Sequence, residues 1–137
     1  MIVIDASVLT DFLLGRPAAL AAVERELAAR EHESLHAPDR IEPETLNAVR
    51  RLASTGAVTE QRANEAAADL AHARIIRYPH APLRARVWSL RHTLTGHDAS
   101  YLALAEALDD PVLLTADRGL ARVACASLGD DAVRHVD

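Results

Sequence analysis

The sequence predicts an α/β fold: a single domain built as a three-layer α/β/α sandwich with a central parallel sheet. Two observations lead to this prediction. Short apolar runs alternate with longer segments of helical periodicity along the whole chain, which is typical of parallel strands joined by right-handed helical crossovers. The chain has 137 residues and is 50% hydrophobic, which fits one domain with one core. We therefore expect residues 1–137 to fold as one unit.

The first half of the chain predicts two strands and four helices. The short apolar runs are residues 1–4 and 35–38, and the segments with helical periodicity are residues 7–14, 18–30, 41–53 and 59–71. Asp5 ends the first run, whose β-branched residues are typical of a buried strand. Pro17 and Pro43 each suit a first helical turn, where a missing N–H costs no hydrogen bond. Gly56 ends the third helix, and Thr59 begins the fourth.

The second half predicts three more strands and three more helices. The strands are residues 74–78, 112–115 and, at an edge, 132–136; the helices are residues 82–94, 98–108 and 118–126. Pro79 stops the first of these strands, because proline lacks the N–H that a sheet needs. The helix that begins at Asp98 is apolar on almost every side, so it is expected to be buried.

The composition excludes several classes of enzyme. All fifteen basic residues are arginine, so a Walker phosphate loop, a receiver domain and Schiff-base catalysis all lack the lysine that they need. The five glycines are too scattered for a dinucleotide-binding loop. Cys125 is the only cysteine, which excludes an intrachain disulfide and a cysteine zinc cluster.

Charge and hydropathy limit where the chain acts and what it binds. A formal net charge of -5 argues against binding nucleic acid through a global positive field, so only a local site can serve. No apolar run approaches the roughly 20 residues that span a bilayer, and the first residues do not form a signal peptide. We expect a cytoplasmic protein with no membrane partner.

Four carboxylates stand where a parallel sheet places its ligand crevice. Asp5 ends the first strand and Asp117 follows the strand at residues 112–115, so both reach the same crevice if these strands are neighbours. Asp98 opens the apolar helix, and Glu44 lies in a first helical turn. Crowded carboxylates repel one another unless a cation neutralises them, and oxygen ligands of this kind suit Mg²⁺, with Mn²⁺ also possible.

Each of these acids also has a purely structural interpretation. Asp98 and Asp117 can each cap the start of a helix, and Asp5 can cap the helix that begins near Ser7. Glu44 can be a solvated first-turn carboxylate that the helix dipole favours.

The order and neighbours of the four acids are more specific than any one of them. The acids and their neighbours lie in five segments, which are residues 3–8, 37–38, 44–51, 97–106 and 114–117. Together these segments resemble PIN domains, and most closely the VapC-type toxins of bacterial toxin–antitoxin pairs, over essentially the whole chain. The resemblance implies a metal-dependent endoribonuclease that hydrolyses RNA phosphodiester bonds. It also implies a cognate antitoxin protein that holds the enzyme inactive, and a homodimer.

The resemblance assigns roles to seven residues. Asp5, Glu44, Asp98 and Asp117 match the acidic quartet of the family, and Ser7, Asn47 and Thr115 match positions that are commonly polar around it. Asp5 and Asp98 are then direct ligands of the main metal ion, Glu44 binds it or orients its water, and Asp117 helps to hold a second ion. The three polar residues support the ligands through hydrogen bonds.

Two other functions stay open on the sequence. One is a non-catalytic interaction module that keeps only the scaffold. The other is a metal-dependent phosphatase or DNA nuclease, because the same chemistry acts on any phosphoester. Candidate phosphate-binding residues are Arg50, Arg51, Arg84, Arg86, Arg91, Arg118 and Arg122. With only four aromatic residues, a base-stacking surface like that of an RNA-recognition motif is not expected. Leu9, Phe12 and Leu13, with the third and fourth helices, offer apolar surface for self-association.

Overall fold

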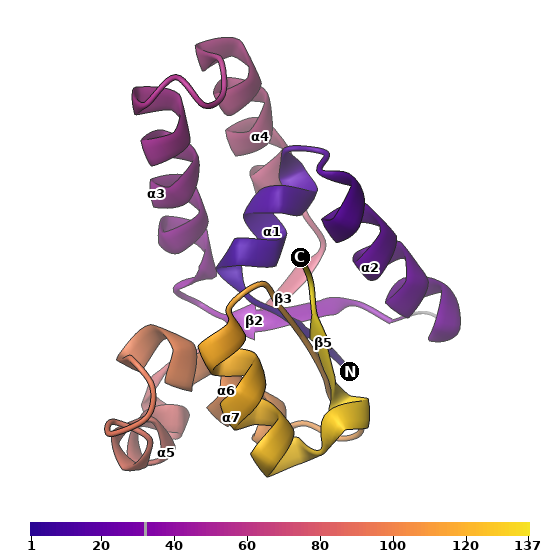
Figure 1. Ribbon diagram of the computed structural model, residues 1–137, viewed down its shortest axis with the longest axis vertical. Helices are drawn as coiled ribbons and strands as arrows, with labels where there is room; N and C mark the ends of the chain where they lie inside the picture. The colour runs from indigo at the N-terminus through magenta and orange to yellow at the C-terminus, as the bar shows by residue number, and fades with distance from the viewer. Residues whose placement is uncertain (32) are drawn as a thin grey trace.

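The computed structural model describes residues 1–31 and 33–137 and contains a five-stranded, wholly parallel sheet (Figure 1). Across the sheet the strands lie in the order β3 (Ile75–Tyr78), β2 (Leu35–Pro38), β1 (Ile2–Ile4), β4 (Val112–Thr115) and β5 (Val133–His135). All four neighbouring pairs are parallel. The predicted α/β class and parallel sheet are confirmed.

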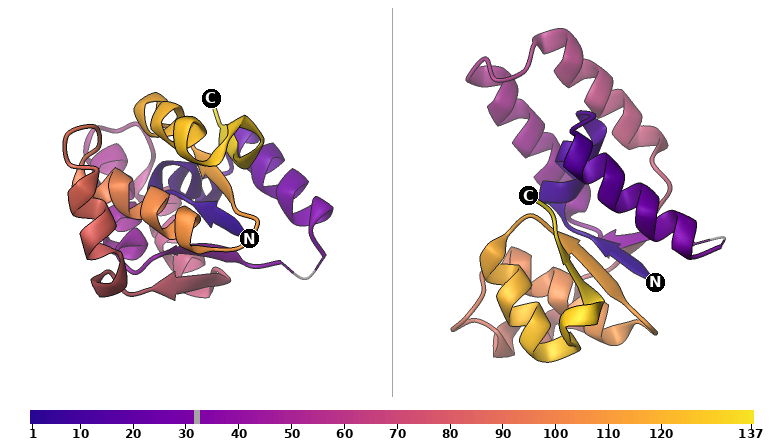
Figure 2. Two further views of the ribbon diagram at one scale, coloured as in Figure 1. Left: turned by 90° about the horizontal axis from the view of Figure 1, so that it is seen from below. Right: turned by 45° about the vertical axis from the view of Figure 1, so that its right-hand side comes forward.

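Helices cover both faces of this sheet, which gives three layers (Figures 1 and 2). On one face lie α1 (Ala6–Leu13), α2 (Pro17–Ala29), α3 (Ile41–Ser54) and α4 (Glu60–His72). On the other lie α5 (Arg84–Ser89), α6 (Gly96–Ala107) and α7 (Arg118–Leu128), with single 3₁₀ turns at Ala81–Leu83 and Asp130–Ala132. Within the described residues no single helix is long and apolar enough to cross a membrane; α1 and α2 reach that length and composition only when counted together, and they are bent by 107°.

The connections reverse direction between β1 and β4. The chain builds β1, β2 and β3 outward along one half of the sheet and then returns to place β4 on the free side of β1. Ile4 at the end of β1 pairs with Leu114 near the end of β4. In open parallel sheets this switch point is where a crevice forms beyond the carboxyl ends of the strands. The residues after β1 and after β4 therefore share one edge of the sheet.

The core is centred on these two strands and on α6. Every residue of β1 and β4 is buried, as expected of strands that are covered on both faces. In α6 the whole run from Ala99 to Ala105 is buried, which confirms the prediction from its apolar sequence. Asp5, Asp98 and Asp117 thus lie on or just after the most firmly packed elements.

The predicted helix at residues 82–94 is wrong in extent. The chain makes one 3₁₀ turn, the short helix α5, and then turns up to α6. Beyond Ser89 the backbone N–H groups of Arg91 and Thr93 donate three residues back, to the carbonyls of Trp88 and Leu90, instead of four. Bonds of this spacing tighten the chain into turns and end the helix.

The apolar surface expected on the first helix is used within the chain. Leu9 and Leu13 are buried in the core, and Phe12 packs against it. These residues therefore cannot supply the self-association surface that the sequence suggested.

Candidate active site

Asp5 is a buried carboxylate held by three donors. It follows β1 directly and is 4% exposed. Its Oδ1 accepts hydrogen bonds from the hydroxyl of Ser7 at 2.5 Å and from the backbone N–H of Val8 at 2.9 Å, and its Oδ2 accepts from the hydroxyl of Thr115. The bond from Val8 caps α1, so the structural role proposed for Asp5 is confirmed. Burial nevertheless raises the pKa of this carboxyl, and these hydrogen bonds oppose the rise.

Hydrogen bonds join the end of β1 to the end of β4. Thr115 donates to Asp5 and accepts from the backbone N–H of Asp117 at 3.0 Å. The Ser7 hydroxyl accepts from the N–H of Ala116 at 3.2 Å. Asp117 itself accepts from the N–H of Leu120 at 2.7 Å and caps α7, as its structural interpretation predicted. Asp5 and Asp117 are therefore fixed relative to each other across the switch point.

Asp98 does not cap its helix. The N-terminal cap of α6 is Thr95, whose hydroxyl accepts from the backbone N–H of Asp98 at 3.3 Å, and the helix begins at Gly96 rather than at Asp98. The capping interpretation of Asp98 is therefore wrong, and its carboxylate needs another role. Burial raises the pKa of Asp98, and the nearby charges of Asp117 and Asp5 raise it further.

Glu44 enters from the opposite layer, in the first turn of α3. Its Oε1 is buried without a hydrogen-bond partner among the described residues, and its Oε2 lies 4.0 Å from Nδ1 of His97. Burial raises the pKa of Glu44, while His97 and Arg40 oppose the rise. Nη2 of Arg40 lies 2.6 Å from Nε2 of His97; because Arg40 can only donate, the imidazole proton belongs on Nδ1, which faces Glu44.

These groups share one cavity of about 550 Å³ at the carboxyl edge of the sheet. Six of the seven residues singled out in the sequence line it: Asp5, Ser7, Glu44, Asn47, Asp98 and Asp117. The seventh, Thr115, lies behind Asp5 and donates to it. Nε and Nη2 of Arg50 donate to Oδ1 of Asn47, at 3.1 and 3.0 Å. The structure therefore gathers all seven, whereas their individual roles stay predictions.

The cavity holds negative charge that its own residues do not neutralise. Asp5, Glu44 and Asp98 all have raised pKa values, and in each case another carboxylate of the cavity adds to the rise. No three histidine, cysteine or acidic side chains of the described residues form a ready-made metal cage. A hard cation that binds few carboxylates and keeps water in its shell fits this donor set. The orphaned Oε1 of Glu44 is a further oxygen with no partner of its own.

Several lining residues were not singled out as site residues on the sequence. Tyr101 lies one helical turn after Asp98, and its hydroxyl is buried beside Glu44 without a partner; burial raises its pKa strongly. That spacing on α6 was the signal that could have found it. Thr10, Asp11 and Ala48 also line the cavity. Asp11 forms an ion pair with Arg16 at 2.8 Å.

The candidate arginines separate into distinct environments. Arg51 lines the cavity and stays a candidate for phosphate binding. Arg86 is held by both oxygens of Glu106, at 2.7 and 2.9 Å, so its guanidinium is already occupied. Arg91 lies over the ring of Trp88. Arg40, which reaches His97, was not among the candidates, because only the fold brings α3 and α6 together.

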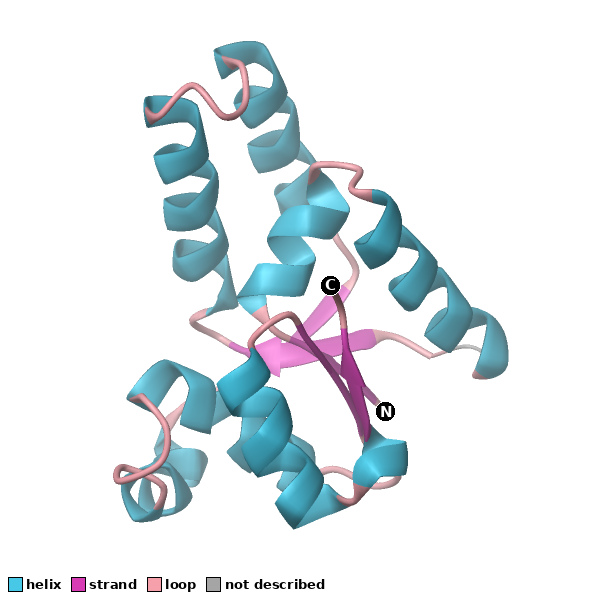
Figure 3. Cartoon of the chain, in the orientation of Figure 1, coloured by secondary structure: helices cyan, strands magenta, loops and turns pink. Residues whose placement is uncertain are grey.

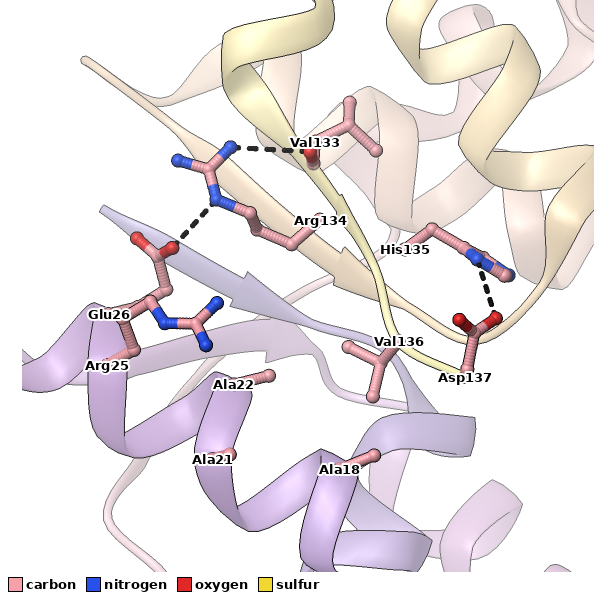
Figure 4. A pocket seen from close by; sticks show the side chains of 10 residues that line it. All are labelled: Ala18, Ala21, Ala22, Arg25, Glu26, Val133, Arg134, His135, Val136 and Asp137. Atoms are coloured by element: carbon pink, nitrogen blue, oxygen red, sulfur yellow. Dashed lines mark hydrogen bonds and ion pairs between the residues drawn. The ribbon is translucent and has the colours of Figure 1, made fainter.

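A second cavity, of about 410 Å³, lies between α2 and β5 (Figure 4). Its buried acid, Glu26, accepts from Nε of Arg134 at 2.8 Å, so this charge is neutralised within the chain. Ala18, Ala21 and Ala22 form its other wall. It has no cluster of unneutralised carboxylates and lacks the chemistry of the first cavity.

Comparisons with known proteins agree with this geometry. The sequence profile of the PIN domain family matches residues 2–125. The chain is 41% identical over 121 residues to Ribonuclease VapC1 of Mycobacterium tuberculosis, covering 87% of each protein. It is 41% identical over 123 residues to Ribonuclease VapC9 of the same organism, covering 85% of this chain and 86% of the relative. Ribonuclease VapC12 is 34% identical over 122 residues, covering 89% and 91%. The chain belongs to the PIN-domain family and, within it, to the VapC ribonucleases.

Proposed function

We propose that this protein is a metal-dependent endoribonuclease, the toxin of a toxin–antitoxin pair, and that residues 1–137 act together as its nuclease domain. The observation that carries the proposal is the cavity at the switch point, where four carboxylates from separate elements meet and three of them have raised pKa values. Its membership of a family of ribonucleases supports RNA as the substrate.

Asp5 and Asp98 are the proposed main ligands of a divalent cation, with Glu44 and Asp117 completing the acidic set. Mg²⁺ is the proposed ion, and Mn²⁺ suits the same oxygen donors. When bound, such an ion supplies Lewis-acid stabilisation of the phosphate and makes water more acidic.

The residues around the acids keep them in position. Ser7 and Thr115 hold the two oxygens of Asp5, so that this carboxylate cannot rotate away from the cavity. Arg40 orients His97, which presents its Nδ1 proton toward Glu44. Asn47 contributes an amide to the wall beside Arg51, a guanidinium that matches phosphate geometry.

A non-catalytic module is the weaker alternative. Burying charged carboxylates beside one another costs folding free energy, and a binding-only scaffold has no need for that cost. A phosphatase or DNA nuclease uses the same donors, so this alternative must be separated by substrate.

The proposed partners are a cognate antitoxin protein, the RNA substrate and a second copy of the chain in a homodimer, all in the cytoplasm. The protein partners need surface beyond the cavity. Leu46 on α3 is 45% exposed and lines a groove between α3 and α4 together with Val49, Ala53 and Ala63. This groove replaces the first helix as the apolar surface that we propose for protein contacts.

Cleavage of matched substrates tests the function. The purified protein is incubated with single-stranded RNA, with DNA of the same sequence and with a phosphomonoester, each with Mg²⁺, with Mn²⁺ and with EDTA. The proposal expects internal cleavage of RNA that depends on the divalent ion. Cleavage of DNA or release of phosphate in preference to RNA would favour the alternative enzyme, and no reaction with any substrate would favour the binding module.

A further inference from the structure

One stretch of the chain differs from the rest in charge. Residues 70–97 contain no aspartate or glutamate, although the chain as a whole carries a net charge of -5. The same stretch holds five of the fifteen arginines and four of the seven histidines. It runs from the end of α4 through β3 and α5 and stops one residue before Asp98. A segment without acidic residues therefore leads directly to the acidic cavity, and two of its arginines, Arg77 and Arg86, are paired with Glu42 and Glu106 from other elements.

The most exposed large apolar side chain described in the protein lies in this stretch. Trp88 on α5 is 67% exposed, which is unusual for a side chain whose burial would contribute several kcal/mol. The guanidinium of Arg91 lies 4.4 Å from the centroid of its ring. Nη1 of Arg91 also donates to the carbonyl of Trp88 at 2.9 Å, which fixes the pair. The ring is held in place and open to solvent.

Trp88 and Arg91 border a cavity of about 410 Å³. Val87 and Leu94 add apolar groups to its lining, and Arg84 and His80 add nitrogen-bearing side chains. Thr95 and Gly96 also line it, and the next two residues, His97 and Asp98, line the acidic cavity. In the part of the chain that the structure describes, neither Arg84 nor Arg91 pairs with a carboxylate, in contrast to Arg86. The two cavities are thus neighbours joined by one helix start.

We propose that this surface, formed by α5 and the turn after it, binds single-stranded RNA beside the cleavage site. A base stacks on Trp88, and Arg84 and Arg91 contact phosphates. Stacking on an aromatic ring combined with a basic groove is how proteins bind single strands without reading their sequence. This inference rests on the proposed ribonuclease function and makes the substrate a single strand. A surface of many aromatic residues is not needed, because one ring anchors one base.

Charge favours RNA over a protein as the occupant. The groove has two arginines without a carboxylate partner among the described residues and no acid along its segment, which complements a polyanion. Its lining ends at Gly96, next to His97 and Asp98 of the acidic cavity, so a strand bound there lies near the carboxylates.

Trp88 is the only tryptophan, so its fluorescence reports on this surface alone. A short single-stranded RNA is titrated into the full-length protein in EDTA, with anisotropy of labelled RNA as an independent measure of binding and a gel to verify that the RNA stays intact. We expect saturable quenching that follows binding. RNA that binds with unchanged Trp88 fluorescence, or fails to bind, overturns the inference. Quenching that rises with protein concentration in the absence of RNA would mean that a second copy of the chain covers Trp88, and it would also overturn the inference.

Matched variants separate stacking from charge. Trp88→Leu should weaken RNA binding by about 5- to 100-fold and leave its salt dependence unchanged. Arg84→Ala should reduce the slope of log K against log salt by about 0.7, the value for one lost phosphate contact on a single strand. Arg25→Ala, an exposed arginine on the opposite layer, is the control and should change neither. Equal losses in all three variants, or none in Trp88→Leu, contradict the proposal.

Cleavage kinetics distinguish failure of this inference from failure of the proposed function. If the protein cleaves RNA, Trp88→Leu should raise KM with kcat nearly unchanged, because the ring contributes binding and not chemistry. Cleavage with unaltered KM would leave the ribonuclease intact and remove the binding surface. A protein that binds RNA at Trp88 yet never cleaves it would keep the binding surface and contradict the proposed ribonuclease function.

Discussion

Asp5 has two functions in one side chain. Its Oδ1 caps α1 through the N–H of Val8, and its Oδ2 takes the hydroxyl of Thr115 from the neighbouring strand. The helix start and the cavity therefore depend on the same carboxylate. Replacing Asp5 would change folding and function together, so residues that touch it give cleaner tests.

Thr115→Val is the first such test. The change removes a buried hydroxyl that donates to Asp5 and accepts from the N–H of Asp117, at nearly constant volume. Since a buried group left without its partner costs about 1 to 3 kcal/mol, the free energy of unfolding should fall by that amount. Urea unfolding measures it.

Thr55→Val is the matched control, because this threonine is exposed at the end of α3 and bonds only to a local carbonyl. Its unfolding free energy should change by less than about 0.5 kcal/mol. Equal losses of unfolding free energy in the two variants would mean that the contacts of Thr115 do not stabilise the fold more than an exposed hydroxyl does.

The sequence located the acids better than their neighbours. Asp5 and Asp117 follow apolar runs directly, so parallel pairing places them at one edge without knowledge of other contacts. Arg40 meets His97 across 57 positions in the chain, and Tyr101 meets Glu44 from another helix. Such contacts depend on how layers pack, and no local pattern encodes that.

At the scale of elements, the start of α6 sets the position of Asp98. Thr95 accepts from the N–H of Asp98 and thereby fixes the first turn of a helix that is otherwise buried. The catalytic assignment of Asp98 consequently depends on a cap that does not itself line the acidic cavity.

Thr95→Ala should lower both stability and cleavage. Loss of an N-cap hydroxyl costs about 0.5 to 2 kcal/mol, and here it also loosens the turn that holds Asp98. Thermal unfolding and RNA cleavage are measured in parallel. Thr95→Ser should restore both, since serine caps equally well.

Thr59→Ala provides the control for this change. Thr59 caps α4 in the same way, accepting from the N–H of Arg62 at 3.1 Å, and lies outside the acidic cavity. It should lose similar stability and keep its cleavage rate at a temperature where it is folded. Loss of activity in both variants would attribute the effect to general destabilisation.

Periodicity predicted most elements closely and failed where the chain closes into turns after a short helix. The third helix was expected at residues 41–53 and runs from Ile41 to Ser54, because Pro43 and a steady apolar stripe define it. The helix expected at residues 82–94 stops at Ser89, after which Arg91 and Thr93 donate to carbonyls three residues back. Whether a segment closes into such turns depends on how it packs, which the pattern of apolar residues does not contain.

At the scale of the whole molecule, the sheet topology brings together charges that disfavour the fold. The strands lie between two groups of helices (Figure 3). β1 and β4 carry Asp5 and Asp117 to the switch point, and α3 and α6 add Glu44 and Asp98. The cavity is therefore a place where stability is given up for function.

The contribution of Asp5, Glu44 and Asp98 to the stability of the metal-free protein should fall as pH rises above about 4, the ordinary carboxyl pKa. Burial raises the pKa of Asp5, Glu44 and Asp98 in the folded protein. Between the ordinary and the raised values the folded state binds more protons than the unfolded state, so these groups lower the free energy of unfolding as they ionise. Thermal unfolding of the wild type and of Asp98→Asn, both in EDTA across this pH range, measures how much Asp98 contributes to the loss of stability.

The variant should lose less stability over the same pH range and be at least as stable as the wild type at neutral pH. Mg²⁺ should restore the wild type, by about 2.7 kcal/mol at one hundred times its Kd, and help the variant less. A wild type whose advantage over Asp98→Asn grows with pH in EDTA would show that the carboxylate is stabilised within the chain and needs no cation.

RNA cleavage by Asp98→Asn at saturating Mg²⁺ shows whether Asp98 serves the reaction. Because Thr95 and not Asp98 caps α6, the amide of the variant is not needed to hold the helix start, and the variant should fold. Cleavage should fall by at least 10- to 100-fold, the usual loss when metal ligation or its support is removed. Asp69→Asn, an exposed carboxylate on α4, should cleave at the wild-type rate. A folded Asp98→Asn protein that cuts RNA as fast as the wild type would contradict the account.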